Sequence, residues 1–114
     1  MEVEPSVAEN MVLVGKKPAM NYVVACLTLF NSGKPTVIVR GRGLAISRAI
    51  DAVELLRKAF VKNLNIQDIS IGTQEFMLPG NIESSTSTIE ITISRPSSAV
   101  GWQPDMAGSS GRGL

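Results

Sequence analysis

The chain has 114 residues, of which 44% are hydrophobic and 18% charged, with a formal net charge of +1, one cysteine (Cys26) and no histidine. These values predict a single globular domain in which Cys26 is packed, and they exclude a fibrous repeat, a chain disordered by composition and a disulfide framework. Because histidine is the commonest general base and metal ligand, its absence leads us to expect no enzyme, no cofactor and no metal site.

The first half of the chain shows two strand-helix pairs in its hydrophobic pattern. We expect, in order, a strand over 11–14, a helix over 18–31, a strand over 36–40 and a helix over 44–63. Pro18 suits a first helical turn, and Gly41-Arg42-Gly43 makes the turn out of the second strand. The predicted core face of the second helix is Ile46, Ala49, Ile50, Val53, Leu56 and Phe60.

The second half predicts a long hairpin. Isoleucines alternate with other residues at Ile69 and Ile71, and again at Ile89, Ile91 and Ile93, and Pro79-Gly80-Asn81 is a strong turn signal between them. Residues 73–88 contain little to anchor them to a core, so the arm is expected to project. The domain then spans 11–95, between a flexible acidic segment over 1–10 and a disordered tail over 96–114.

The order strand-helix-strand-helix-strand-strand is that of a two-layer α+β fold, with two helices on one face of a mixed four-stranded sheet. Right-handed crossovers would make the first three strands parallel, so that their carboxyl ends share one edge. Lys16 and Lys17 leave the first strand there, Arg40 and Arg42 the second, and the hairpin tip the third. Residues 11–95 hold ten Lys or Arg against six Asp or Glu, a difference of +4. This edge is expected to attract anions.

Several motifs allow a simpler interpretation. Lys16-Lys17 alone would indicate a solvated loop, but it adjoins a glycine turn and a helix N-terminus, where a bound anion would relieve the conflict with the helix dipole. Gly41-Arg42-Gly43 begins like a dinucleotide fingerprint, yet its third glycine position is Ile46. Asp51 and Glu54 fit an exposed ion-pair face better than an acid-base pair. For Tyr22, core packing and stacking on a sugar or base remain equally open.

The sequence resembles the Alba family of archaeal chromatin proteins. The resemblance spans about residues 11–95 and rests on Val12-Leu13-Val14-Gly15-Lys16-Lys17-Pro18-Ala19-Met20-Asn21-Tyr22-Val23, Gly41-Arg42-Gly43-Leu44-Ala45-Ile46-Ser47-Arg48-Ala49-Ile50-Asp51 and Ser87-Thr88-Ile89-Glu90-Ile91. It implies a fold like the C-terminal domain of translation initiation factor three. It also implies a homodimer, or a heterodimer with a paralogue, that binds double-stranded DNA and RNA with little sequence preference, coating or condensing chromosomal DNA.

Within that resemblance, the expected nucleic-acid contacts are Lys16, Lys17, Tyr22, Arg40, Arg42, Arg48, Gln74 and Asn81. The family also implies acetylation of Lys16, which would remove a charge at a phosphate contact, and dimer-dimer association through Phe60. Leu44 stands where many members have an arginine, and the arm carries Glu75 and Glu83 with no Lys or Arg, whereas family arms are often basic.

The acidic arm keeps a second interpretation open, a structural RNA-binding subunit of a ribonucleoprotein particle, because protein contacts tolerate glutamates that a minor groove would repel.

The expected cellular location follows from other features of the sequence. No apolar run approaches the roughly 18 residues of a membrane helix, and the acidic residues 1–10 are unlike the start of a signal peptide. We therefore expect a cytoplasmic, chromosome-associated protein without membrane contact.

Overall fold

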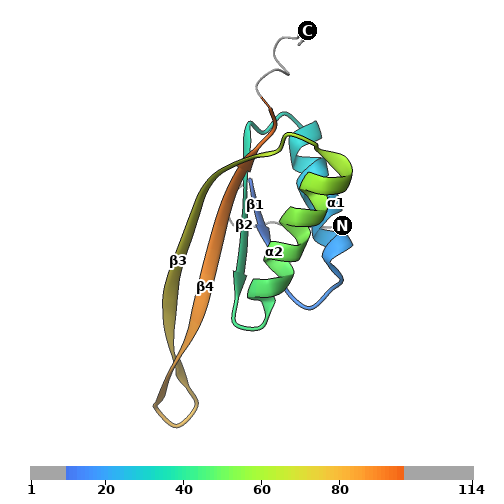
Figure 1. The fold of residues 1–114 in the computed structure, drawn as a ribbon. Coiled ribbons are helices and arrows are strands. Elements are labelled where there is room, and N and C mark those ends of the chain that lie inside the picture. The colour runs from blue at the N-terminus through green and yellow to red at the C-terminus, as the bar shows by residue number, and fades with distance from the viewer. Residues whose placement is uncertain (1–9, 97–114) are drawn as a thin grey trace, which may run out of the picture.

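A mixed four-stranded sheet with two helices on one face organises residues 10–96, the part of the chain that the computed structural model describes (Figure 1). The elements are β1 (Met11–Leu13), α1 (Ala19–Asn31), β2 (Thr36–Arg42), α2 (Ala45–Leu55) with a π-helical turn η1 (Leu56–Phe60), β3 (Asn65–Leu78) and β4 (Ile82–Ser94). The two-layer α+β fold predicted from the sequence is confirmed. Within residues 10–96, no helix is long and apolar enough to cross a membrane.

The strands lie in the order β1-β2-β4-β3. β1 pairs with β2 in parallel, and β4 pairs antiparallel with β2 on one side and β3 on the other. Since β4 returns between them, β1, β2 and β3 run in the same direction without β2 and β3 being neighbours. The carboxyl ends of these three strands therefore share one end of the molecule, as predicted, and this is the lower end in Figure 1.

The boundary of the domain differs by one residue from the prediction. Asn10 was placed in a flexible segment, but its backbone oxygen accepts a hydrogen bond from Ile38 N at 2.9 Å and its side-chain amide donates to Thr36 O at 3.2 Å. Asn10 is thus part of the sheet edge. The rest of the predicted flexible segment and all but the first residue of the predicted tail lie outside the described residues.

Two other predicted boundaries are corrected by hydrogen bonding and packing. The glycine turn was expected at Gly41, yet Gly41 and Arg42 stay in β2 because they pair with Ile89 and Thr88 of β4. The chain turns at Gly43, whose φ is 56°, a left-handed conformation that glycine adopts without steric cost. The second helix was expected to reach residue 63, but it ends in η1 at Phe60.

The hydrophobic core lies between the helices and the inner face of the sheet. Its most deeply buried side chains are Val23, Cys26 and Phe30 of α1, Ala49, Ala52 and Val53 of α2, Leu56 of η1, and Val37, Val39, Ile91 and Ile93 of the sheet. Burial raises the pKa of the Cys26 thiol to about 12, so this cysteine stays protonated and is packed, as predicted. Ile50 and Phe60 were expected in the core, but they are 42% and 45% exposed.

Gly41 allows α2 to approach β2 closely. A Cβ at this position would lie 2.8 Å from Ala45 O and 3.1 Å from Ala49 Cβ. We predict that Gly41→Ala lowers the free energy of unfolding by about 1–3 kcal/mol, because neither backbone nor a buried methyl can move aside cheaply. Denaturant titration measures this loss. Gly72→Ala is the matched control, since its Cβ would meet Thr88 Oγ1 at 3.4 Å, an ordinary contact; equal losses in both variants would contradict the packing argument.

Candidate nucleic-acid interface

The loop between β1 and α1 presents Lys16 and Lys17 to solvent. The N–H groups of Gly15 and Lys17 donate to the hydroxyl of Tyr22, at 2.9 and 3.1 Å, so a side chain from the first turns of α1 holds both sides of Lys16. The loop is therefore shaped by a phenolic oxygen that accepts two backbone hydrogen bonds. Within residues 10–96, neither lysine side chain has an ion-pair partner.

Tyr22 itself is 9% exposed and belongs to the hydrophobic core. Its ring is packed, so its faces are not open to a base or sugar, and of the two alternatives left open by the sequence the structure supports packing. The expectation that Tyr22 contacts nucleic acid directly is therefore not supported by its position. Its connection to the site is indirect, through the loop that carries the lysines.

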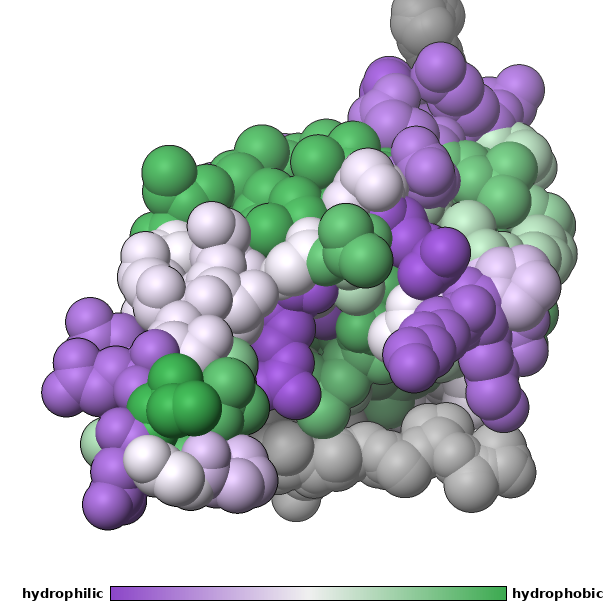
Figure 2. All heavy atoms as spheres, turned by 90° about the horizontal axis from the view of Figure 1, so that it is seen from below, coloured by the Kyte–Doolittle hydropathy of each residue, from purple (hydrophilic) through white to green (hydrophobic). Residues whose placement is uncertain are grey.

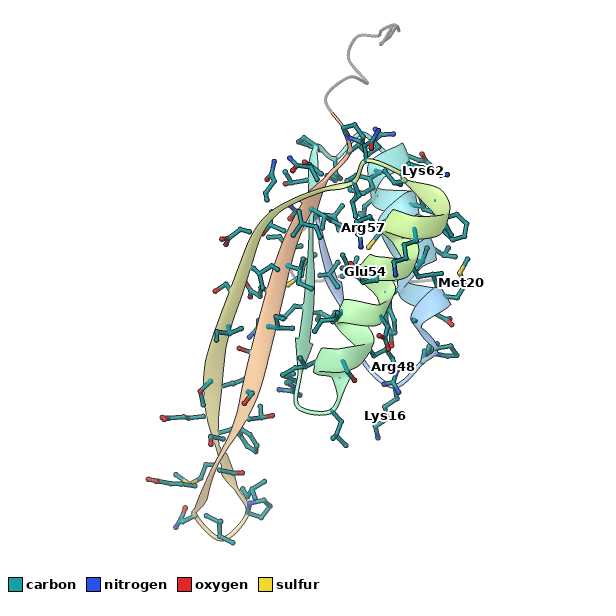
Figure 3. All side chains as sticks on the ribbon, viewed as in Figure 1. Lys16, Met20, Arg48, Glu54, Arg57 and Lys62 are labelled. Atoms are coloured by element: carbon teal, nitrogen blue, oxygen red, sulfur yellow. The ribbon has the colours of Figure 1, made fainter. Side chains whose placement is uncertain are left out.

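Arg48 reaches the same loop from α2. Its Nη1 donates to Gly15 O at 2.7 Å, and the side chain is partly buried there. Gly15 is thus held through its N–H by Tyr22 and through its carbonyl by Arg48. Figure 3 shows Lys16 and Arg48 close together at the lower end of the domain, whereas Lys62 lies at the opposite end.

The two arginines of β2 are held by the hairpin. Arg40 lies opposite Glu90 of β4, with its Nε 3.5 Å from Glu90 Oε2, so part of its charge is already balanced. Arg42 Nη1 donates to Gln74 Oε1 of β3 at 3.3 Å. Because residues two apart on a strand share a face, and the intervening Gly41 faces α2, both arginines lie on the helix-free face of the sheet.

These side chains surround one open hollow of about 880 Å³, which we call the basic hollow. Of the residues that the structure describes, it is lined by Leu13, Val14, Gly15, Lys16, Arg40, Gly41, Arg42, Leu44, Ala45, Arg48 and Gln74, a set with four cations and no carboxylate. Figure 2 looks onto this end of the molecule and shows hydrophilic groups gathered around a depression that also has hydrophobic walls. The structure thus brings together five of the eight expected contact residues.

The other three expected residues lie elsewhere. Lys17 is exposed beside the hollow without lining it, and Tyr22 is buried beneath the loop. Asn81 occupies the turn of the hairpin, with a φ of 61°, beyond the last β3-β4 pair at Leu78 and Ile82. The hairpin projects from the domain as predicted (Figure 1).

Of the two acids considered on α2, Glu54 is part of an ion-pair face. Glu54 accepts hydrogen bonds from Arg57, with Nε at 3.2 Å, and lies 3.7 Å from Lys58 Nζ. The hydrogen bond from Arg57 is the main reason that the pKa of the Glu54 carboxyl is lowered. A carboxylate held ionised in this way is a poor proton donor at neutral pH, and the predicted ion-pair interpretation of Glu54 is confirmed.

A further surface was missed by sequence reasoning, because its residues have the alternation of a core strand. Ile66, Ile69 and Ile71 of β3 pair with Ile93, Ile91 and Ile89 of β4, so they face the helix side of the sheet. The β4 partners are buried, but the β3 isoleucines are 36%, 56% and 81% exposed. The sequence carries no local signal for this surface, because only the spatial strand order places β3 at the edge of the sheet.

The fold and the basic hollow define a class: a small α+β protein with a cationic end built from the β1-α1 loop, β2, α2 and the base of a long hairpin. The Alba family model matches residues 10–73, and the chain belongs to the Alba family, which confirms the resemblance seen in the sequence.

Relatives of known name and structure agree with this membership. The chain is 53% identical over 68 residues to DNA/RNA-binding protein Alba 1 of Archaeoglobus fulgidus, covering 60% of this chain and 76% of the relative. It matches the structure of Alba from Thermoplasma volcanium with a TM-score of 0.70 at 40% identity, over 75% of this chain and all of that one. ALBA1 of Trypanosoma brucei shares the fold, with a TM-score of 0.67 at 23% identity, over 82% of this chain and 75% of that one.

We predict that Tyr22→Phe loosens the lysine loop, because the N–H groups of Gly15 and Lys17 lose their acceptor. A partly buried hydrogen bond contributes about 1 kcal/mol, so amide hydrogen exchange at these two positions should accelerate roughly five-fold or more. The measurement is residue-resolved exchange by NMR. Amides of Val23 and Cys26 in the body of α1 serve as internal controls, and unchanged exchange at Gly15 and Lys17 would show that the hydroxyl does not hold the loop.

Proposed function

We propose that this protein binds double-stranded DNA and RNA with little sequence preference, through phosphate contacts in and beside the basic hollow. The observation that carries the proposal is that Lys16, Arg40, Arg42 and Arg48 line one hollow whose lining residues within 10–96 include no carboxylate. Phosphates are the anions that such a set of guanidinium and ammonium groups suits best. The printed name of the Archaeoglobus relative, a DNA/RNA-binding protein, supports the same conclusion.

The cations differ in how much of their hydrogen-bonding capacity is already used. Arg48 is engaged with Gly15 O, Arg42 with Gln74 and Arg40 with Glu90. Lys16 and Lys17 are exposed, so they can meet phosphates without giving up a protein contact. Acetylation of Lys16 would remove one of these charges and lower affinity, which makes this lysine the expected point of regulation.

We propose further that the protein is a homodimer formed through an apolar ledge. The ledge comprises the helix-side isoleucines of β3, Ile66, Ile69 and Ile71, together with Ile50 of α2. On α2, Ile50 lies about 160° around the helix axis from Arg48, which points toward the β1-α1 loop, so Ile50 faces the β3 side. Exposed apolar side chains on an edge strand and on the flank of α2 that faces it suit an isologous contact with a second copy.

A dimer through the ledge would leave the opposite flank of the helices available. Met20 and Val24 of α1 are 42% and 51% exposed, and Phe60 ends η1 at 45% exposure. These residues support the expected role of Phe60 in joining dimers side by side, which would let the protein coat or compact chromosomal DNA. The same ledge would also accept a closely related paralogue.

We predict that Lys16→Ala/Lys17→Ala flattens the salt dependence of duplex DNA binding. Each phosphate contact contributes a slope of roughly −0.9 in log affinity against log salt, so losing two contacts should flatten the slope by about 1.8. Fluorescence anisotropy at a series of salt concentrations measures it. Lys58→Ala/Lys62→Ala removes the same charge from residues outside the basic hollow. Equal slopes for both double variants would remove the lysine pair from the interface.

We predict that Ile69→Ser/Ile71→Ser converts the dimer to a monomer, because it removes the centre of the ledge without touching the core. Sedimentation velocity measures the species. Val24→Ser changes an apolar side chain on α1 that is 51% exposed; it is the control and should sediment as the dimer. If the ledge variant still sediments as a dimer, the second copy binds elsewhere.

One observation favours a second candidate, a structural subunit of a ribonucleoprotein particle. The arm carries Glu75 and Glu83 with no Lys or Arg over residues 73–86. This negative charge suits contacts with protein better than contacts with a duplex groove that is bordered by phosphates. Competition between duplex DNA and structured RNA for the purified protein, at one salt concentration, separates the two candidates. A preference for structured RNA of tenfold or more, about 1.4 kcal/mol, would favour the particle subunit.

A further inference from the structure

The tip of the hairpin combines exposed apolar residues with acids. Phe76, Met77, Leu78 and Ile82 are 40%, 58%, 40% and 57% exposed. The pairing of Phe76 with Ser84 and of Leu78 with Ile82 places three apolar side chains on one face of the ribbon. Glu75 and Glu83 lie on the other face with Met77, where they border a hollow of about 490 Å³. We call residues 75–83 the arm tip.

The arm tip is poorly suited to nucleic acid. Within residues 10–96 neither Glu75 nor Glu83 has an ion-pair partner. Their carboxylates would be repelled by phosphates, whichever groove the tip approached. Four large apolar side chains clustered at the end of a two-stranded ribbon are also not explained by the core, since the ribbon has no helix over it (Figure 1). Such a cluster marks a protein contact.

The basic hollow has the complementary chemistry. Beside Lys16, Arg42 and Arg48 it has apolar walls, in which Leu13 is 50% and Leu44 is 96% exposed. Its volume of about 880 Å³ lies within the range of roughly 300–1,000 Å³ that encloses a compact ligand. The basic hollow therefore complements the arm tip in two ways: its cations suit the tip carboxylates, and its apolar side chains suit the apolar side chains of the tip.

The tip cannot enter the hollow of its own chain. The β3-β4 ladder is continuous from Gly72 to Leu78. Its base is fixed to the end of β2 through the Arg42-Gln74 contact, and to the β2-α2 loop through a hydrogen bond from Gly43 N to Ser87 O at 2.9 Å. Gln74 lines the hollow, and Leu78 lies four residues further along, about 13 Å beyond it at roughly 3.3 Å per residue. The hollow that the tip meets must belong to another molecule.

We propose that the arm tip of one copy docks in the basic hollow of a second copy of this chain, where Glu75 and Glu83 meet the cations and the apolar tip side chains meet Leu13 and Leu44. The proposal rests on the proposed function only in that both use the same hollow. Nucleic acid and the arm tip then compete for one set of cations. The acidic arm becomes a built-in competitor that keeps the hollow covered until a polyanion displaces it.

Site-directed crosslinking tests this contact in the full-length protein without nucleic acid. A Met77→Cys variant is mixed with a Leu44→Cys variant at low salt and treated with a short bismaleimide, and the linked peptides are identified by mass spectrometry. Cys26 is buried and does not compete for the reagent. The expected result is a Met77→Cys to Leu44→Cys product several-fold above that from mixing Met77→Cys with Lys58→Cys, an exposed position on η1. Equal yields from the two mixtures would overturn the proposal.

Charge dependence gives the second readout. Glu75→Gln/Glu83→Gln in the Met77→Cys variant should lower the yield several-fold, and so should 1 M salt, at which the Debye length is about 3 Å. Asp51→Asn/Asp68→Asn makes the same charge change at exposed acids outside the arm and should leave the yield unchanged. Identical yields from the two neutralised variants would show that the glutamates do not dock.

Adding duplex DNA separates this proposal from the proposed function. If both hold, DNA lowers the crosslink yield in proportion to its binding. If the crosslink forms with its charge dependence and DNA changes nothing, the arm-tip contact stands and the hollow is not the nucleic-acid site. If DNA binds with the predicted salt slope and no specific crosslink forms, the proposed function stands and the arm-tip contact is wrong.

Discussion

The pairing of β4 with β2 on one side and with β3 on the other constrains the rest of the molecule. It places β3 at the edge of the sheet, beyond the reach of the helices, and it makes β1, β2 and β3 run the same way. The first consequence exposes three isoleucines whose β4 partners form the core. The second brings the β1-α1 loop, the end of β2 and the arm to one end, where positive charge from distant parts of the chain collects.

The basic hollow depends on hydrogen bonds within the protein as much as on its positive charge. Tyr22 and Arg48 hold Gly15 from two sides, and Gly41 lets α2 approach β2 closely enough for Arg48 to reach the loop. The arginines are thereby fixed in place by protein groups, while the two lysines remain exposed. A rigid frame with exposed ammonium groups suits a ligand that varies in sequence but repeats its phosphates. An ammonium group is also the part of the site that acylation can neutralise.

Much of this could be predicted from the sequence, because the relevant signals are local. The periods of the strands and helices, the turn at Gly80 and the Lys16-Lys17 motif each depend on neighbouring residues. The misplaced features depend on distant partners. Arg42 stays in β2 because Thr88 of β4 pairs with it. Ile50 and Ile71 have core periodicity, and only the spatial strand order leaves them exposed.

Contacts at the apolar ledge and in the basic hollow respond differently to ionic strength. This difference separates assembly of the protein from its binding of nucleic acid. The ledge lies on the helix side of β3, whereas Arg40, Arg42 and Gln74 lie on the opposite face of the sheet or at the end of that face. Both surfaces of one copy can therefore be bound at the same time. Salt screens the contacts of Lys16 and its neighbours with phosphates, and equally those with Glu75 and Glu83. Apolar burial at Ile69 and Ile71 does not weaken with ionic strength. Rising salt should therefore empty the hollow while the proposed dimer persists, so that nucleic acid and arm would compete on a unit with two hollows and two arms.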